Sequence, residues 1–258
     1  MKITSLLENT TSHSDMKTEH GLSLYIETEN LNILFDMGQS ANFAENAQKL
    51  GIDLKKVDFA VLSHGHYDHG GGLKTFLEQN PNAPVYLNPH AFGPHYGTSE
   101  NYIGIDQGLQ NNERLIFTHD AMDLGSGLSL HLPQGREKVC NLGSFGLTML
   151  RDGEFLPDDF RHEQYLLVEE NGKRILFSGC SHQGVVNVAA WFRPDVLIGG
   201  FHFSTLPLDD TLLGYAAFLN DLDTAYYTCH CTGQAQYEFM RREMKNLTYL
   251  AAGQTVVV

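Results

Sequence analysis

The chain has 258 residues, of which 42% are hydrophobic and 19% are charged, and its formal net charge is −14. This composition is typical of a globular protein with enough apolar side chains for a core. The negative charge disfavours nucleic acid and anionic membranes as partners, although bound cations would still permit an anionic small-molecule substrate. No linker or internal repeat divides the chain, so we expect a single domain over residues 1–258. The sequence leaves its oligomeric state open.

Three features that the sequence lacks bear on where in the cell the protein is located. The first residues turn polar too soon for the apolar segment of a secretory signal. No apolar run approaches the roughly 20 residues of a membrane-spanning helix. Four cysteines are too few for a disulfide scaffold in a chain of this length. These features predict a cytoplasmic protein.

Apolar runs separated by turn residues predict alternating strands and helices in the first half of the chain. The short apolar runs flank polar turns, as strands do, and the segment before Gly51 has helical spacing and ends at that glycine. The expected elements are strands at 22–26 and 33–35, a helix at 42–50, a strand at 57–62, a helix at 73–79, and strands at 85–87, 115–118 and 128–132.

The second half largely repeats this order. Asn171-Gly172 predicts a tight turn between two of its strands. The expected elements are strands at 165–168 and 174–178, a helix at 185–192, a strand at 196–198, a helix at 212–222, a strand at 225–228, a helix at 234–245 and a strand at 255–258. This order favours an α/β fold in which two sheets pack together with helices outside, an αββα sandwich. Two glycine-rich stretches, 90–113 and 133–159, lack periodicity and read as long insertions, which are often functional.

Residues 63–70 carry the strongest functional signal in the chain. They read Ser-His-Gly-His-Tyr-Asp-His-Gly and directly follow an apolar strand. The motif places His64, His66, Asp68 and His69 within six positions. Neutral imidazole and carboxylate are ligands of borderline and hard divalent ions. The spacing therefore predicts a metal site at the end of this strand.

Further ligands of that site are expected at other strand ends, because a rigid scaffold carries functional residues on its loops. His162 precedes a predicted strand, while Cys180, His182, His202 and His230 each follow one. The cysteines on either side of His230 are expected to point into the core. Four other histidines lack this context and are expected to be structural or exposed: His13, His95, His119 and His131.

The chain resembles the metallo-β-lactamase superfamily over nearly its whole length, because these motifs follow one another in the order typical of that family. Within it, the chain resembles the branch of dihydropterin-ribofuranosylaminobenzene 5'-phosphate synthase-like proteins. The matching segments are residues 19–23 (Glu-His-Gly-Leu-Ser), 34–38 (Leu-Phe-Asp-Met-Gly), 63–70, 179–182 (Gly-Cys-Ser-His) and 230–233 (His-Cys-Thr-Gly). The resemblance implies the αββα fold, two divalent metal ions and metal-dependent chemistry.

Carried over residue by residue, the resemblance implies two ligand sets. The first ion would be held by His64, His66 and His162, and the second by Asp68, His69 and His230. The superfamily usually has a bridging aspartate where this chain has Cys180. Either the Cys180 thiolate is a ligand, which favours zinc over manganese, magnesium or iron, or His182 takes its place.

Two divalent ions about 3.5–4 Å apart lower the pKa of a water molecule and stabilise the charge that develops on an ester, phosphoester or amide. Asp68 would ligate metal and orient the attacking oxygen. His182 or His202 could protonate the leaving group. Asp36 resembles a group that orients a metal-bound histidine through its free ring nitrogen.

The predicted function is therefore that of a hydrolase or transferase acting on a small phosphorylated or cyclic ester, which the branch suggests is pterin-related. The alternatives are a di-iron redox protein and a non-catalytic ligand-binding or sensor protein that contains metal. Candidates for substrate contact, or simply for loop packing and solvation, are the aromatics Tyr96, Tyr102, Phe145 and Phe155, the cations Arg136, Lys138, Arg151 and Arg161, and the histidines His20 and His90.

Overall fold

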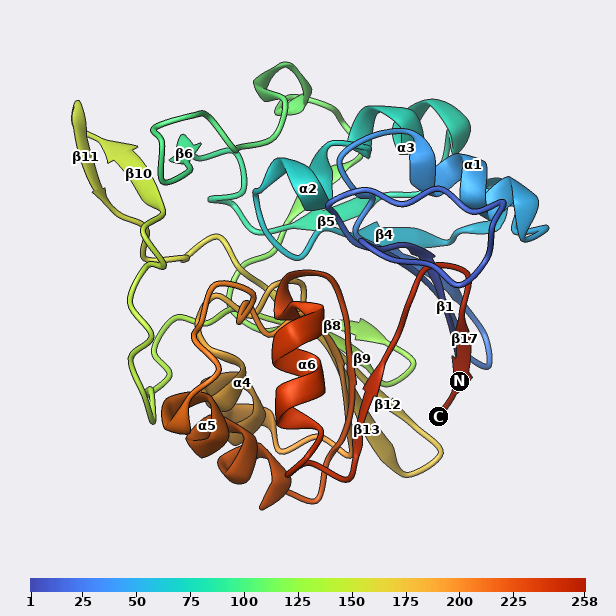
Figure 1. Ribbon diagram of the computed structural model, residues 1–258. Coiled ribbons are helices and arrows are strands. Elements are labelled where there is room, and N and C mark those ends of the chain that lie inside the picture. The colour runs from blue at the N-terminus through green and yellow to red at the C-terminus, as the bar shows by residue number, and fades with distance from the viewer.

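The computed structural model describes residues 1–258, and its elements form four layers in the order helix, sheet, sheet, helix (Figure 1). The predicted αββα sandwich is thus confirmed. No helix combines the length and apolar character that crossing a membrane would require.

The first sheet contains seven strands, antiparallel at one end and parallel from its fourth strand onward. Helices α1 (Asn42–Lys49) and α3 (Leu73–Gln79) cover its outer face with an apolar cluster that includes Phe43 and Phe76. In spatial order its strands are β17 (Thr255–Val257), β1 (Lys2–Leu7), β2 (Ser23–Glu27), β3 (Asn32–Phe35), β4 (Phe59–Val61), β5 (Val85–Leu87) and β7 (Leu115–Phe117).

The second sheet also has seven strands, and it is parallel over its first four. Helices α4 (Val185–Phe192), α5 (Asp210–Asn220) and α6 (Gln234–Met240) cover its outer face. Its strands are β16 (Leu247–Tyr249), β15 (Ala225–Thr228), β14 (Val196–Gly199), β13 (Lys173–Phe177), β12 (Tyr165–Glu170), β9 (Leu128–His131) and β8 (Met122–Gly125).

A shared apolar core holds the two sheets together. The rings of Phe35 on β3 and Phe177 on β13 lie 5.8 Å apart, and Val61, Leu166 and Ile198 are buried in the same cluster. Each such side chain contributes about 2 kcal/mol through removal of its apolar surface from water. The site residues follow β4, β13, β14 and β15, so this packing determines how their loops face one another.

The sequence analysis expected the two insertions to be irregular, but parts of them form strands. They pair with each other in a small third sheet, in which Met149 lies opposite His95 and Thr148 opposite Tyr96. Its strands are β11 (Glu154–Pro157), β10 (Thr148–Arg151) and β6 (His95–Tyr96). Such short strands, paired across a long chain separation, leave little periodicity in the sequence.

Besides the strands of the third sheet, three strands were not predicted, and one helix ends well before its expected end. Strands β1, β8 and β16 were not predicted, and α6 ends at Met240 rather than at Lys245. The Glu243 N–H donates to the Met240 carbonyl, so the chain leaves the helix in a tight turn. Strand β1 is buried at nearly every position, which removes the alternation by which a half-buried strand is recognised. The structure also has a short helix α2 (Tyr67–Gly70) and three single turns of 3-10 helix, at Leu54–Lys56, Gln107–Leu109 and His230–Thr232.

Candidate metal centre

Asp36, at the end of β3, fixes the start of the histidine motif that follows β4. Its carboxylate accepts hydrogen bonds from the Ser63 N–H and hydroxyl, each at 2.7 Å, and its Oδ2 lies 2.6 Å from His69 Nδ1. All three residues are buried. The expected contact between Asp36 and a ligand candidate is therefore present, and it leaves His69 Nε2 facing the site.

His64 and His66 direct unpaired nitrogens into the interior. The Nε2 atoms of both rings are buried and have no hydrogen-bond partner, while His64 Nδ1 is held by the Ser63 hydroxyl at 2.9 Å. Burial, with lesser contributions from neighbouring histidines, lowers the pKa of both rings well below its ordinary value. Both imidazoles are therefore neutral at pH 7, which is the form that binds metal.

His182 joins these two histidines. The donor nitrogens of His64, His66 and His182 all lie within 4.8 Å of one another. The buried Glu163 carboxylate holds His182 by accepting from its backbone N–H at 2.6 Å and lying 3.0 Å from its Nδ1. The Phe160 ring stacks on the imidazole with 4.5 Å between centroids. Burial lowers the pKa of His182 and raises the pKa of Glu163.

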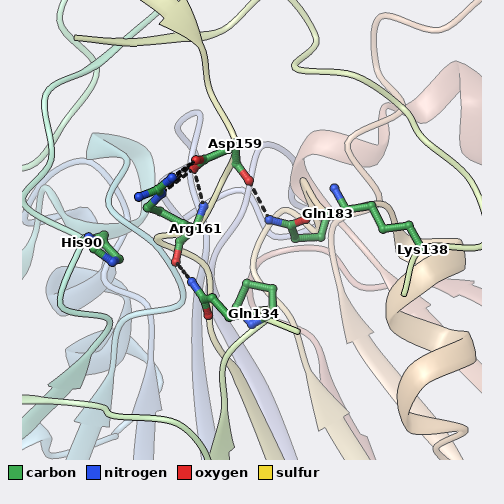
Figure 2. Close-up of a pocket in the computed structure, with 7 residues that line it drawn as sticks. His90, Gln134, Lys138, Asp159, Arg161 and Gln183 are labelled. Carbon is green, nitrogen blue, oxygen red and sulfur yellow. Dashed lines mark hydrogen bonds and ion pairs between the residues drawn. The ribbon is translucent and has the colours of Figure 1, made fainter. Parts of the chain in front are cut away.

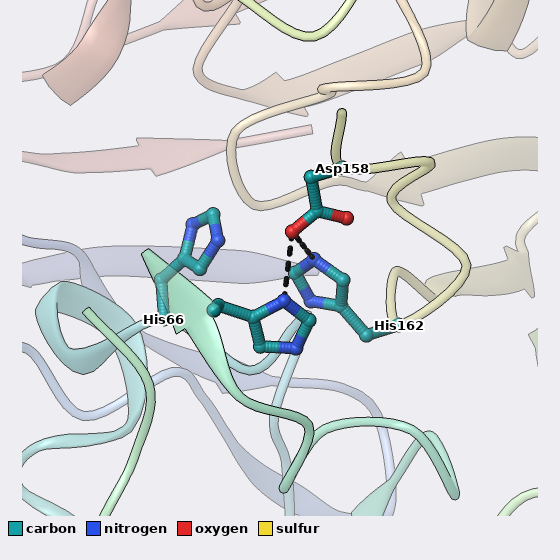
Figure 3. Close-up of side chains that lie close together, drawn as sticks. His66, Asp158 and His162 are labelled. Carbon is teal, nitrogen blue, oxygen red and sulfur yellow. Dashed lines mark hydrogen bonds and ion pairs between the residues drawn. The ribbon is translucent and has the colours of Figure 1, made fainter. Parts of the chain in front are cut away.

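His162 is buried but makes different contacts. Its Nδ1 accepts a hydrogen bond from the Gly65 N–H at 3.0 Å, and its Nε2 faces Asp158 Oδ2 at 3.6 Å (Figure 3). The same carboxylate oxygen lies 2.7 Å from Nδ1 of His95, whose ring centroid is 3.8 Å from that of His162. His95 is therefore buried beside the site, with its donor near that of His66. His95 was expected to be structural or exposed; it is buried, and its donor lies within 4.8 Å of those of His66, Asp158 and His162.

A second group of donors lies beside the first. The donor atoms of Asp68, His69, Cys180 and His230 are all within 4.8 Å of one another, and all four residues are buried. His69 Nε2 is 3.1 Å from Cys180 Sγ and 3.2 Å from His230 Nε2, which is 3.1 Å from Asp68 Oδ2. Unlike the first group, this group includes a carboxylate and a thiol.

Burial and neighbouring charges shift the pKa values of the residues in this second group. Burial alone would lower the pKa of His69, but the Asp36 and Asp68 carboxylates outweigh it and raise that pKa to about 9. Burial would raise the pKa of Asp68, but His69, His20 and His230 hold it well below the usual value. Burial raises the pKa of the Cys180 thiol well above its ordinary value.

Cys231 lies at the site rather than in the core. Its Sγ accepts the His202 N–H at 3.3 Å, and the donors of Cys180, His202 and Cys231 lie within 4.8 Å of one another. Burial would raise the pKa of Cys231, but hydrogen bonds with Cys180 and His202 outweigh it and hold that pKa well below the ordinary value. The expectation that both flanking cysteines point into the core holds only for Cys229, which is buried between the sheets.

Four site loops contain a residue in the left-handed backbone region. The φ angles are 60° at Asp36, 56° at Ser181, 54° at His202 and 50° at His230. Residues other than glycine seldom adopt this conformation, and such strain gathers at functional sites. The loops are therefore held in place by the surrounding packing and by the hydrogen bonds described above.

A pocket of about 280 Å³ opens onto these groups, and both insertions contribute to its wall. Cys180, His182, His202 and Cys231 line it together with Asp68. The first insertion adds Gly97, Thr98, Asn101 and Ile103, and the second adds Phe145 and Leu147. A pocket of this size fits a small molecule or part of a larger one.

The remaining aromatic and histidine candidates divide between pocket and loops. His20 lines the pocket and places its Nε2 3.3 Å from Asp68 Oδ2. Phe145 also lines it, with its ring 4.5 Å from that of His202. In contrast, Tyr96 packs edge-on against Tyr102 and Phe155, so these three aromatics stabilise the insertions.

Two of the four cationic candidates line a different pocket, of about 330 Å³ (Figure 2). Lys138, Arg161 and His90 line it, and Arg161 Nε is 2.8 Å from Asp159 Oδ2. Arg151 also pairs with Asp159, at 3.5 Å. Arg136 lies over the ring of Phe192 at 4.4 Å. None of these cations lines the pocket at the histidine cluster.

Several residues that position the site were not identified from the sequence. Glu8 Oε1 accepts the His230 N–H at 2.7 Å, and Asn9 Oδ1 lies 2.8 Å from His230 Nδ1. They were missed because the preceding strand, β1, was not predicted. Glu163 and Asp158 lie within four positions of His162, and a carboxylate next to a candidate histidine would have been the signal for them.

Comparison with known proteins identifies the family. Residues 17–222 match the family model of the metallo-beta-lactamase superfamily. The chain belongs to that superfamily. A crystal structure described as that of Tm1679, a metal-dependent hydrolase of the beta-lactamase superfamily, superposes on it with a TM-score of 0.83 at 30% identity, covering 100% of this chain and 99% of the other. The zinc-bound PqqB of Methylobacterium extorquens shares the fold, with a TM-score of 0.61 at 15% identity.

Two superfamily relatives from Methanocaldococcus jannaschii match along most of their length. An uncharacterised protein is 30% identical over 239 residues, covering 88% of this chain and 90% of the relative. The 7,8-dihydropterin-6-methyl-4-(beta-D-ribofuranosyl)-aminobenzene-5'-phosphate synthase is 28% identical over 286 residues, covering 99% and 96%. The predicted resemblance to the superfamily and to this branch is confirmed.

Proposed function

We propose that this protein is a metal-dependent hydrolase or transferase that uses two divalent ions to act on a small phosphorylated or cyclic ester, pterin-related in its chemistry. The observation that carries the proposal is the convergence of two groups of buried donors on one pocket. Support also comes from the relatives, one described as a metal-dependent hydrolase and one named as a dihydropterin phosphate synthase.

The first ion fits among His64, His66 and His182. Two unpaired buried Nε2 atoms would each cost about 1–3 kcal/mol, which a metal ion would offset. The Glu163 carboxylate beside His182 Nδ1 fixes the tautomer that leaves Nε2 free, the arrangement commonly found behind metal-bound histidines. Together with the Phe160 ring stacked on the imidazole, these contacts hold His182 in a fixed orientation.

His162, which the resemblance places in this set, is disfavoured by its hydrogen bonds. Its Nδ1 accepts from the Gly65 N–H, so the neutral ring carries its proton on Nε2, the atom that would have to bind metal. Its Nε2 is buried without a hydrogen-bond partner, and Asp158 Oδ2 lies 3.6 Å away. We therefore assign the third position to His182, and the role of His162 as a ligand stays a prediction for experiment to decide.

The second ion fits among Asp68, His69, Cys180 and His230. One carboxylate, one thiolate and two imidazoles make a donor set that favours zinc over manganese, magnesium or iron. Asn9 and Asp36 hold the outer ring nitrogens of His230 and His69, so both histidines present Nε2 to the ion.

When bound, the two ions would supply an activated water and a Lewis acid for the substrate. Asp68 would ligate the second ion and would orient the attacking oxygen by accepting a hydrogen bond from it. His202 lies on the pocket wall and is placed to donate a proton to the leaving group. His182 also lines the pocket, but its assignment as a ligand leaves His202 as the proposed acid.

The substrate enters the pocket between the insertions. Phe145 offers a ring for a flat heterocycle to stack on, and the polar atoms of Thr98 and Asn101 lie on the same wall. We infer that the partner is a small molecule rather than nucleic acid or membrane, consistent with the net charge of −14. The cytoplasmic location stays a prediction.

The test is metal analysis of protein purified without added metal, followed by a panel of phosphodiesters, phosphomonoesters and lactones. We expect about two ions per chain, chiefly zinc, and turnover on at least one class that a chelator abolishes. A fully loaded protein that is inert on the whole panel would contradict the enzymatic proposal and favour a sensor. Iron in place of zinc would support the di-iron redox alternative.

A further inference from the structure

We propose that Cys180, His202 and Cys231 form a third metal subsite, which takes a thiophilic divalent ion such as zinc or cadmium. The three residues follow three neighbouring parallel strands, β13, β14 and β15, and their donor atoms lie within 4.8 Å of one another. His202 and Cys231 belong to neither ligand set of the proposed two-ion centre, and an ion on His202 Nδ1 leaves the Nε2–H of that ring for the proton donation proposed above. The subsite adjoins that centre only through Cys180, whose sulfur has lone pairs for two ions.

The spacing of the donors suits a zinc-like ion. Zinc binds sulfur at about 2.3 Å and imidazole nitrogen at about 2.0–2.1 Å, so donors in one tetrahedral shell are roughly 3.5 Å apart. Since the three donors lie within 4.8 Å of one another, the side chains need to close by at most about 1 Å. Movements of that size are within the reach of side-chain rotation alone.

The surroundings hold Cys231 in place for this role. A Cβ atom at Gly200 would lie 2.3 Å from Cys231 Sγ, so only glycine leaves room for the sulfur here. The His202 N–H donates to the same sulfur at 3.3 Å. The sulfur is therefore packed against backbone on one side and open toward Cys180 and the pocket on the other.

His202 supplies the second, independent observation. Its Nδ1 is buried and has no hydrogen-bond partner, although an unpaired buried nitrogen costs about 1–3 kcal/mol. Its backbone is also strained, with a φ of 54°. A bound cation would satisfy the ring and account for a costly conformation on this loop.

Binding balances in charge and protons. Because Cys180 already binds the second ion as a thiolate, only the Cys231 thiol has a proton to lose, and that proton leaves for solvent as the Cys231 sulfur–metal bond forms. The Cys231 thiolate then supplies one negative charge, and the Cys180 thiolate is shared between the two ions. Only three protein ligands are present, and all three line the pocket. Such a site keeps an open fourth position, which is typical of catalytic rather than structural zinc, and could accept water or a substrate atom.

Cadmium content tests the subsite directly. We would load the full chain with cadmium under reducing conditions, remove the excess, and measure bound cadmium by mass spectrometry. Cys231→Ser and His202→Ala should each bind one equivalent less than the wild type. Cys140→Ser is the matched control, because Cys140 lies outside every donor group, and it should bind the same amount as the wild type.

The difference in bound cadmium between variant and wild type tests the third subsite. The cadmium that stays bound to the variants tests the two-ion centre. Failure of the third subsite can therefore be distinguished from failure of the proposed function. Circular dichroism verifies that each variant is folded, and the partly exposed His202 offers the gentler substitution. Equal cadmium content in wild type and both folded variants would overturn the proposal.

Cobalt provides a second readout that does not depend on activity. The thiolate-to-cobalt absorption band of the loaded wild type should weaken in Cys231→Ser and stay unchanged in Cys140→Ser. An unchanged band in Cys231→Ser would contradict the subsite. A disulfide-linked Cys180–Cys231 peptide from protein that binds no third equivalent would also overturn it, and would assign the two thiols to a redox pair.

Discussion

The two donor groups at the centre of this protein differ in charge although they are neighbours. The first, His64, His66 and His182, consists of neutral imidazoles with lowered pKa values. The second group contains a carboxylate, a thiol with a raised pKa and a histidine whose pKa is about 9. The first group is thus ready for an ion at pH 7, whereas the second must release protons to bind one.

The difference arises from the partners that each group contacts. A serine hydroxyl and the buried Glu163 hold the first group, and no carboxylate lies among its donors. Asp36 and Asp68 both lie next to His69 in the second group. We therefore expect the two ions to differ in affinity, in pH dependence and in sensitivity to mutation.

The largest effects are expected from removing one ligand of each group. His66→Ala should lose the first ion and Asp68→Ala the second, and both variants should lose turnover, because the reaction needs both ions. Metal content and hydrolysis measured on the same preparations test this. Either variant with full occupancy and unchanged turnover would contradict the two-ion scheme.

The next effect separates two histidines that are equally buried. His182→Ala should bind one ion fewer than the wild type, whereas His162→Ala should keep both, because the His162 Nδ1 contact with Gly65 leaves its Nε2 protonated. Metal content by mass spectrometry gives the answer. The opposite pattern would restore His162 as the ligand implied by the superfamily resemblance.

A smaller effect is expected from the carboxylate behind His182. Glu163→Gln keeps an oxygen for the backbone N–H but removes the charge beside Nδ1, so affinity for the first ion should fall by about 10–100-fold. Competition with a chelator measures this affinity. Tyr165→Phe, which removes one contact to the same carboxylate, serves as a milder control. Unchanged affinity in Glu163→Gln would show that the carboxylate does not position this ligand.

The last expected effect concerns the pH dependence of metal binding and needs no substitution. Because the pKa of His69 is raised to about 9, the ring is protonated at pH 7 and must lose that proton to bind metal. Since His69 and the Cys180 thiol, whose pKa is also raised, each lose one proton, affinity for the second ion should increase about a hundredfold per pH unit from pH 6 towards pH 9, while affinity for the first ion changes little. Titrations at several pH values distinguish the two. Equal slopes would contradict the assigned difference in charge.

The sequence analysis identified the part of the site that is local in the chain. His64, His66, Asp68 and His69 lie within six positions, so their spacing alone predicted a metal site. The strand ends that carry Cys180 and His230 were also recognisable from apolar runs, and the structure brings those residues to the motif. The fold could be predicted because the strand order and family motifs agree along the chain.

What could not be predicted depends on orientation. The Gly65 N–H, 97 positions away in sequence, determines which ring nitrogen of His162 is free, and the Glu163 carboxylate, 19 positions away, does the same for His182. The side to which Cys231 points, core or pocket, depends on the backbone conformation of the preceding residue, His230, whose φ is 50°. His95 entered the site through a strand pairing between two insertions, which has no periodic signature.

The most direct test of the central claim is anomalous diffraction from crystals of the zinc-loaded protein. The account predicts one zinc peak among His64, His66 and His182 and a second among Asp68, His69, Cys180 and His230. A first ion held instead by His162 with His66, His95 or Asp158, and no peak within reach of His182, would contradict the assignment on which the proposed function rests.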